Sequence, residues 1–590
     1  MAEPHGPPTP DRDEVHLHKK PRLQDDIKTA ASVAGPSDVP MDEPIVDENI
    51  AESSSTPQQS NGKGPKPRGK NKRRKKDKVP AIEPYSTEDV ILHDVQALLG
   101  EDVVLKAQEA GEDLKAPFEK QQVVELVVSA LSSNGESLSI APAPHPPWVI
   151  LTPFALPGEK IRVKIYRNAR LWSYADLVEV VEPNKELRDM DRVQCKYFGK
   201  CAGCQFQMLS YDAQLDLKRT VVVKAYQNFS GLPESTVPSI QPTIGSPLQY
   251  GYRTKITPHF DSPLRDLKKH GRPEDGSKPD WFKIGFNVIG TRHTMDIEEC
   301  PIATPTLNKA LGPIREGIVN KMDTYKKGVS LLLRESLEIP ADGSPNPLPP
   351  PADTSVDSLT SDVEKKLCVT DHRGTIRERV GDKLFEYTAG SFFQNNNSVL
   401  VPLTSYVRDC IFPTTPSSSS STSLPRPTHL VDAYCGSGLF AITLSPHFER
   451  VTGIELSVDS IKSANISAQL NALSPDRHTF MSGDASDIFA TVTSFPRLET
   501  AVIIDPPRKG SDEKFIDQLI EFGAGVMVYV SCNVHTQARD IGMILRKSKA
   551  KRESGGGKEY VLESVRGFDL FPQTAHVESV AVLRLVDVDA

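Results

Sequence analysis

The chain has 590 residues, which is more than a single hydrophobic core of about 250 to 300 residues accommodates, so its length excludes a one-domain protein. Eight cysteines are too few for a secreted disulfide scaffold, and neither a long apolar run nor an apolar leader is present, so we expect an intracellular protein without membrane spans. The net charge of -8 argues against a nucleic-acid-binding protein, but this number averages regions of opposite sign.

Residues 1–85 are predicted to be a disordered tail that carries a basic tract. Residues 1–60 hold 12 acidic and 5 basic side chains and few aromatics, a composition that cannot bury enough apolar surface to fold. Lys63 to Lys78 then carries ten Lys or Arg residues against the single Asp77. We interpret this tract as a nuclear-localisation signal, with the nucleus and/or cytoplasm as the location, or as a phosphate-binding arm; a solvated linker is the plain alternative.

Residues 115–185 are predicted to form a small β-barrel. Short alternating strands lie between 121 and 182 and are separated by turns such as Asn134-Gly135. A β-domain that binds no ligand explains this pattern equally well. Residues 190–390 follow as a mixed α+β central domain.

Within that central domain, we expect one helix over Tyr211–Phe229 and strand-like runs at 252–260 and 283–290. Residues 340–362 are rich in proline, which predicts a surface insertion.

From 391 to 590 the pattern changes to alternating strands and helices, and the fold class that we predict is α/β, with a mainly parallel, doubly wound, Rossmann-like sheet. The first strand ends in DAYCGSG (432–438), where glycines leave room for a cofactor to approach the backbone. Glu455 ends the next strand, where a carboxylate can accept hydrogen bonds from ribose hydroxyls. Because the third glycine of a dinucleotide motif is absent, a nucleoside cofactor is favoured over NAD. Asp484 is a candidate for the adenine edge.

Two later strands end in residues that can do chemistry. One ends in Asp505-Pro506-Pro507-Arg508; amino-group methyltransferases commonly place an aromatic where Arg508 stands, which argues against methylation of an exocyclic amine. The other ends at Cys532, and the same edge of the sheet can hold Glu578. Methylation of carbon 5 of a pyrimidine needs a thiolate that adds to carbon 6 and a base that removes the proton from carbon 5. Taken alone, Cys532 is more simply a buried, unreactive cysteine.

In their order along the chain, these motifs resemble those of a known family. They are similar to the RNA uracil-5-methyltransferases that use S-adenosylmethionine, over about residues 120–590, and the matching motifs are FFQNN (392–396), YCGSG, IELS, DPPRKG, VSCN and HVES. Leu439 departs from the family, whose members often have Asn at that place. The resemblance implies that the β-barrel is a TRAM-like OB domain that holds RNA.

The resemblance also assigns roles to individual residues. It implies that Cys532 is the nucleophile and Glu578 the base. The residues that it implies for cofactor binding are Gln394, Tyr434, Glu455 and Asp505.

A second group of cysteines lies ahead of these motifs. Cys195, Cys201 and Cys204 fall within ten residues, and Cys300 follows later. Four thiolates suit an iron-sulfur cluster or a structural zinc, and spacing does not choose between them; unligated thiols are the plain alternative. Some members of the similar family carry a 4Fe-4S cluster on this pattern, so the resemblance favours that cofactor over zinc. Uracil methylation moves no net electrons, so we expect a structural role in RNA docking.

The resemblance implies an enzyme that methylates carbon 5 of a uridine in tRNA, at position 54 of the T-loop, through a covalent cysteine adduct. The expected partner is tRNA, with no membrane and no obligatory protein partner. Arg253 and Lys255 are candidates for phosphate contacts, with solvated strand charge as the alternative. A ribosomal-RNA uracil methyltransferase and a non-catalytic RNA-binding or RNA-folding module remain alternatives. A cytosine-5-methyltransferase is disfavoured, because Arg508 stands where such RNA enzymes generally use a second cysteine.

Overall fold

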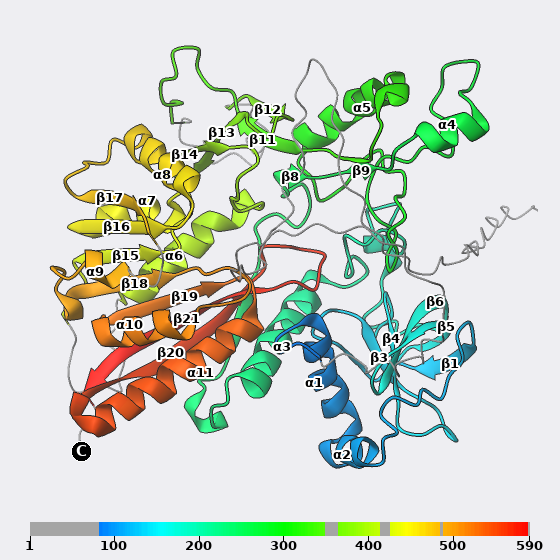
Figure 1. The fold of residues 1–590 in the computed structure, drawn as a ribbon, viewed down its shortest axis with the longest axis horizontal. Coiled ribbons are helices and arrows are strands. Elements are labelled where there is room, and N and C mark those ends of the chain that lie inside the picture. The colour runs from blue at the N-terminus through cyan, green and yellow to red at the C-terminus, as the bar shows by residue number, and fades with distance from the viewer. Residues whose placement is uncertain (1–81, 349–363, 414–424, 484–487, 588–590) are drawn as a thin grey trace, which may run out of the picture.

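The computed structural model describes residues 82–348, 364–413, 425–483 and 488–587. The basic tract, most of the predicted tail, part of the proline-rich insertion and Asp484 lie outside the described residues. The described chain forms a small N-terminal β-domain, a mixed central region and a large eight-stranded sheet (Figure 1). Among the described helices, none has the length and apolarity to cross a membrane.

The N-terminal β-domain contains six short strands whose sheet returns on itself. The strands are β1 (Val123–Val127), β2 (Ala130–Leu131), β3 (Ser137–Ile140), β4 (Val149–Thr152), β5 (Lys160–Asn168) and β6 (Trp172–Glu182). Their order is β1-β5-β6-β4-β3-β2, with β4 and β6 parallel and the other neighbours antiparallel. Two residues separate β1 from β2, so the chain itself joins the two ends of the sheet. The core contains the buried, alternating side chains of Ile161, Val163 and Ile165.

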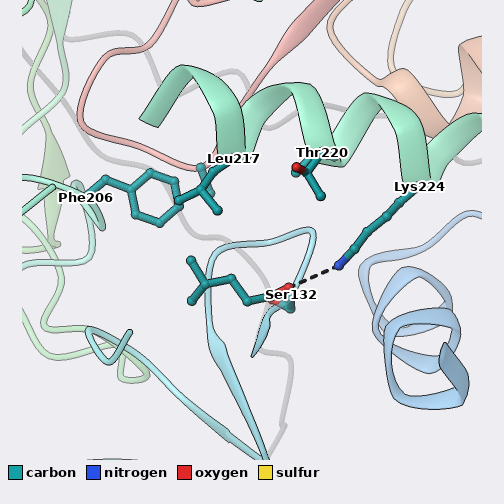
Figure 2. A pocket seen from close by; sticks show the side chains of 8 residues that line it. Ser132, Phe206, Leu217, Thr220 and Lys224 are labelled. Atoms are coloured by element: carbon teal, nitrogen blue, oxygen red, sulfur yellow. Dashed lines mark hydrogen bonds between the residues drawn. The ribbon is translucent and has the colours of Figure 1, made fainter. Parts of the chain in front are cut away.

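Two helices precede the β-domain, α1 (Thr87–Leu99) and α2 (Glu101–Glu109), and α1 connects it to helix α3 (Tyr211–Phe229). Asp94 of α1 accepts hydrogen bonds from the Ser133 N–H (2.7 Å) and from Lys224 Nζ (2.8 Å). Figure 2 shows a pocket at this junction, where Lys224 also donates to the Leu131 carbonyl (3.1 Å). The structure confirms α3 with the bounds that the sequence predicts.

The central region is less regular than the sequence suggests. Its helices and strands are α4 (Leu264–His270), α5 (Pro305–Asn320), β8 (Lys255–Ile256), β9 (His259–Phe260), β10 (Val329–Ser330), β11 (Leu333–Leu337), β12 (Lys366–Val369), β13 (Thr375–Val380) and β14 (Lys383–Thr388). The strand-like run at 252–260 forms two short strands, β8 and β9, and the run at 283–290 forms only isolated bridges. Pro258, which has no N–H to donate to a ladder, lies between β8 and β9.

The C-terminal region is the doubly wound sheet that the sequence predicts. In spatial order its strands are β17 (His478–Ser482), β16 (Arg450–Glu455), β15 (His429–Ala433), β18 (Thr500–Ile504), β19 (Val526–Ser531), β21 (Glu578–Asp587), β20 (Lys558–Phe568) and β7 (Gln241–Ile244). β15 to β19 are parallel to their neighbours in this group, whereas β21 is antiparallel to both β19 and β20. The strand order reverses between β15 and β18, and such sheets bind ligands beyond the carboxyl ends of the strands at that point.

Helices cover both faces of this sheet. They are α6 (Leu400–Ile411), α7 (Leu439–Leu444), α8 (Val458–Leu470), α9 (Ile488–Thr491), α10 (Glu513–Phe522) and α11 (Val534–Lys551). Alternate residues of β15 enter different core clusters: Leu430 packs with α6, α7 and α8, and Val431 packs with α3, α10 and α11. This two-sided burial explains why the strands are apolar almost throughout.

Candidate active site

The register of the sheet brings three of the predicted cofactor residues to one edge. Ala433 of β15 pairs with Ile454 of β16 and with Ile504 of β18. The residues that follow these partners therefore leave the sheet side by side, and they are Tyr434, Glu455 and Asp505. This edge is the carboxyl end of the strands at the point where their order reverses.

The turn after β15 is held open by unusual backbone conformations. Tyr434 (φ 62°), Gly436 (φ 54°) and Gly438 (φ 90°) all lie in the left-handed region, which only glycine adopts without strain. The Gly436 N–H donates to Glu455 Oε2 (3.2 Å), and the Ser457 N–H donates to Oε1 of the same carboxylate (2.9 Å). Glu455 is thus aimed at the turn by two backbone hydrogen bonds.

Two polar groups beside this turn were not predicted as site residues. Asp432 Oδ2 accepts a hydrogen bond from the Ala441 N–H (2.9 Å). Its other oxygen and Ser437 Oγ are buried and have no partner among the described residues. A carboxylate in the penultimate position of a buried strand is the sequence signal that could have identified Asp432. Buried polar atoms without partners fit a site that binds a polar ligand.

The carboxyl groups at this edge influence one another. Burial, followed by the charges of Asp505 and Glu455, raises the pKa of Asp432 to about 8. Burial and the charge of Glu455 raise the pKa of Asp505 to about 7. Negative charge at this edge is therefore costly unless a cation accompanies it.

Cys532 and Glu578 meet at the same edge. Ser531 at the end of β19 pairs with Ser579 of the antiparallel β21, so Cys532 and Glu578 are the residues that adjoin this pair. The pKa of the Glu578 carboxyl rises to about 8, because burial and the charge of Asp505 outweigh Arg508. The pKa of the Cys532 thiol rises to about 12, because burial and the charges of Glu578 and Asp505 outweigh Arg508.

Arg508 is the cation that acts on both of these groups. Its carbonyl oxygen accepts hydrogen bonds from Asn533 Nδ2 (2.9 Å) and Thr536 Oγ1 (3.1 Å). The next carbonyl, of Lys509, accepts a hydrogen bond from the Arg539 guanidinium (2.9 Å). The start of α11 thus holds the 505–510 loop against Cys532. From the sequence, Arg508 served only to exclude other methylation reactions.

Gln394 is buried in the segment between β14 and α6. Its neighbour Phe393 belongs to the same core cluster as Cys435 of the glycine turn and Leu439 directly after it. The role of Gln394 as a cofactor residue stays a prediction.

The two predicted phosphate ligands lie beside that segment. The Thr254 N–H, between Arg253 and Lys255, donates to the Asn395 carbonyl (2.9 Å). The Arg253 guanidinium lies 5.9 Å from the centroid of the Phe571 ring. Burial, then the charges of Arg334 and Arg253, lowers the pKa of Lys255 to about 8. Neighbouring cations destabilise one another's charged forms, and an anionic partner would relieve this repulsion.

The four cysteines of the second group do not form a metal-ligand set as they are placed. The described residues contain no group of three or more His, Cys, Asp or Glu side chains arranged to hold a metal ion. Burial is the first cause that raises the pKa of each thiol, and Cys204 reaches about 12 with further contributions from Cys300, Cys201 and Cys195. The placement of these side chains therefore does not support the predicted ligand set.

Comparisons with known proteins agree with the geometry of the sheet edge. A profile of the tRNA (Uracil-5-)-methyltransferase family matches residues 355–585. The chain is 41% identical over 505 residues to the tRNA (uracil(54)-C(5))-methyltransferase of Schizosaccharomyces pombe, covering 86% of this chain and 84% of the relative. It is 38% identical over 488 residues to the protein of the same name from Saccharomyces cerevisiae, covering 79% and 74%.

A solved structure shares the fold. The tRNA (uracil-54, C5)-methyltransferase of Pyrococcus abyssi, in complex with S-adenosyl-L-homocysteine, matches 78% of this chain and 99% of its own, with a TM-score of 0.52 and 23% identity. At this identity the match supports the fold alone, and it extends beyond the catalytic sheet.

Proposed function

The chain belongs to the tRNA (uracil-5-)-methyltransferase family, and on this premise we propose that it methylates carbon 5 of uridine 54 in tRNA with S-adenosylmethionine. The observation that supports the proposal is the pairing of Ser531 in β19 with Ser579 in β21, which brings Cys532 and Glu578 to the same edge of the sheet. A thiol and a carboxyl group at this edge suit methylation of carbon 5, because that carbon is not itself nucleophilic.

The direct test is methyl transfer by the purified protein. Incubation with methyl-labelled S-adenosylmethionine and unmodified tRNA is expected to label the RNA when residue 54 is uridine and not when it is cytidine. Ribosomal RNA is the second control, and preferential labelling of it would overturn the choice of tRNA. If the protein binds RNA but transfers no methyl group, the alternative of a non-catalytic RNA-binding module is favoured.

We infer that Gln394, Tyr434, Glu455 and Asp505 bind S-adenosylmethionine. This cofactor, when bound, supplies the methyl group on a positively charged sulfur. The raised pKa of Asp505 and of Asp432 supports a cationic ligand, because a nearby cation stabilises both carboxylates. The unpartnered Asp432 Oδ1 and Ser437 Oγ fit its polar groups. Calorimetry checks the assignment: Glu455→Ala should weaken cofactor binding and leave tRNA binding unchanged.

We propose that the reaction passes through a covalent adduct. The Cys532 thiolate forms a bond from Sγ to carbon 6 of uracil, and the electrons of the 5,6 double bond move to O4 as an enolate. Those electrons then bond carbon 5 to the methyl group, whose former sulfur keeps the electron pair of the broken bond. The Glu578 carboxylate removes the proton from carbon 5, the double bond re-forms, and Sγ leaves as a thiolate.

The thiol addition is expected to accelerate as the pH rises, because the raised pKa of Cys532 leaves few thiolates at neutral pH. Glu578→Gln removes a negative charge that raises this pKa, so it should shift the profile to lower pH. Arg508→Met removes the cation that lowers the pKa, so it should shift the profile to higher pH. The measurement is adduct formation with tRNA containing 5-fluorouridine at position 54, whose fluorine cannot leave as a proton does. Shifts in the opposite directions would contradict these electrostatics.

We propose that the N-terminal β-domain is a TRAM-like OB barrel that holds RNA. If β1 and β2 are counted as one strand, its order and its parallel β4–β6 pair match a five-stranded Greek-key barrel. On its surface, Tyr166 stacks on Tyr174 with ring centroids 6.1 Å apart, and the Arg167 guanidinium lies 4.1 Å from the Tyr174 centroid. Stacked aromatic and cationic side chains are typical of surfaces that bind single-stranded RNA.

Deletion of residues 1–80 is expected to weaken tRNA binding at low salt by about tenfold or more, because the ten cations of Lys63 to Lys78 are lost. The salt dependence of the dissociation constant should become shallower, and the barrel should provide the remaining affinity. Methyl transfer at saturating tRNA should be unchanged; a dead truncated enzyme would contradict this division of labour. Fusion of the tract to a fluorescent protein tests our second proposal for it, nuclear localisation.

For the four cysteines we propose a metal centre that has no part in the reaction steps. The proposal is supported by spacing and by the mutual electrostatic effects of Cys195, Cys201, Cys204 and Cys300. Anaerobically purified protein is expected to contain about four irons per chain and the visible absorbance of a 4Fe-4S cluster. One zinc per chain would favour the alternative metal, and the absence of both would leave four reduced thiols.

A further inference from the structure

We propose that Gln214 and Lys218 of α3 are positioning residues for the base Glu578. They act through the connecting segment 569–577, which joins β20 to β21 and leads directly into Glu578. The inference rests on the proposed function, because it assigns a purpose to the placement of that carboxyl group. Gln214 lies 359 residues before Gln573, its partner in the connecting segment.

Gln214 and Gln573 form a reciprocal pair of amide hydrogen bonds. Gln214 Nε2 donates to Gln573 Oε1 (3.1 Å), and the Gln573 N–H donates to Gln214 Oε1 (3.0 Å). The two residues are 1% and 2% exposed, so water does not replace these bonds. Gln573 also has a φ of 71°, a left-handed conformation that a residue other than glycine keeps only when its surroundings impose it.

Lys218 holds the start of the connecting segment. It follows Gln214 by one helical turn and is fully buried, as is its ion-pair partner Asp569. Lys218 Nζ also donates to the Phe571 carbonyl (3.0 Å), and the Tyr211 hydroxyl donates to Asp569 Oδ2 (3.0 Å). Buried charges are stable only when paired in this way, so the segment has one strongly preferred position relative to α3.

The contacts of Gln214 and Lys218 with the connecting segment should matter for one step of the reaction, the removal of the proton from carbon 5. Neither Gln214 nor Lys218 bonds to Cys532 or Glu578, but the segment that they hold determines where Glu578 begins. A base must lie within hydrogen-bond reach of the proton that it removes, and a displacement of about 1 Å can cost about 10²-fold in rate. Thiol addition is carried out by Cys532. This residue follows β19 and is not part of the connecting segment, so its addition to carbon 6 does not depend on where Glu578 lies. Loosening the connecting segment should therefore slow proton removal and spare formation of the adduct.

The experiment compares Gln214→Met with the parent on unmodified tRNA. The expected result is a fall of about 10²-fold in turnover, together with accumulation of a covalent enzyme–tRNA adduct that survives denaturing electrophoresis. Adduct formation with 5-fluorouridine tRNA should remain close to the parent rate. Gln573→Gly provides a second variant, since glycine tolerates the left-handed φ and keeps the backbone bond to Gln214. It should show the same signature with a smaller fall in turnover.

Asn471→Leu is the matched control. Like Gln214, Asn471 exchanges two hydrogen bonds with one distant residue, here with the N–H and the carbonyl of Leu384 (3.0 and 2.7 Å), and it lies at the end of α8. It should change neither turnover nor the amount of adduct. The inference is overturned if both glutamine variants keep the parent turnover, or if turnover and adduct formation with 5-fluorouridine tRNA fall by the same factor. If the parent itself forms no adduct with 5-fluorouridine tRNA, the proposed function fails instead.

Discussion

Cys532→Ala is expected to lower methyl transfer by at least about 10⁴-fold while tRNA and cofactor affinities stay near those of the parent. The physical reason is that carbon 5 of uracil becomes nucleophilic only after a thiolate has added to carbon 6, and alanine has no atom that can add. The side chain is half-buried, so removal of one sulfur atom should not unfold the domain. The measurement is the rate of label transfer to tRNA in a single turnover.

The control for this prediction is Cys368→Ala. Cys368 is another half-buried cysteine, in β12, and burial raises the pKa of its thiol to about 11. This variant should methylate tRNA at the parent rate and should form the adduct with 5-fluorouridine tRNA, which Cys532→Ala should not form. Equal rates for Cys532→Ala and the parent would refute the covalent mechanism.

Glu578→Gln should trap the enzyme on its own substrate. The amide cannot accept the proton from carbon 5, so the methylated adduct forms and then resolves about 10² to 10⁴ times more slowly. The first step should not suffer, because the lost charge is one that raises the pKa of Cys532. Denaturing electrophoresis of a reaction with unmodified tRNA should show most of the enzyme covalently bound to RNA, each adduct carrying one labelled methyl group.

A different outcome would assign the proton removal elsewhere. The nearby candidate is His576, whose pKa is lowered to about 4 by burial and by the charges of Arg508 and Lys218, so that it is a neutral base at physiological pH. If Glu578→Gln turns over normally and His576→Gln accumulates the adduct, Glu578 is not the base. His576→Phe, which keeps a ring to pack on Phe571, distinguishes loss of the nitrogen from loss of packing.

Much of the catalytic region was predictable, because its signals are local. The glycines and the DPPR and SCN motifs each span only a few residues at the end of a strand, and they indicated the α/β fold and the edge at which Glu455, Asp505 and Cys532 lie. The strand-like runs around Pro258 and Gly285 form only short strands and isolated bridges, because β-propensity does not show whether a partner strand is available. The spacing of the four cysteines of the second group likewise predicted that their thiols lie near one another, but it did not predict how the side chains are arranged, which is not that of a metal-ligand set in the described residues.

The amino-acid order predicted the reaction class, the candidate nucleophile and the candidate base, because its short motifs resemble those of a known family. Three-dimensional contacts were needed to learn that Cys532 and Glu578 adjoin one strand pair, that Arg508 is the cation acting on both, and that Gln214 bonds to the segment before Glu578. The reason is physical. Register, burial and the resulting pKa values arise from contacts between residues far apart in the chain, and no periodicity in the sequence records them.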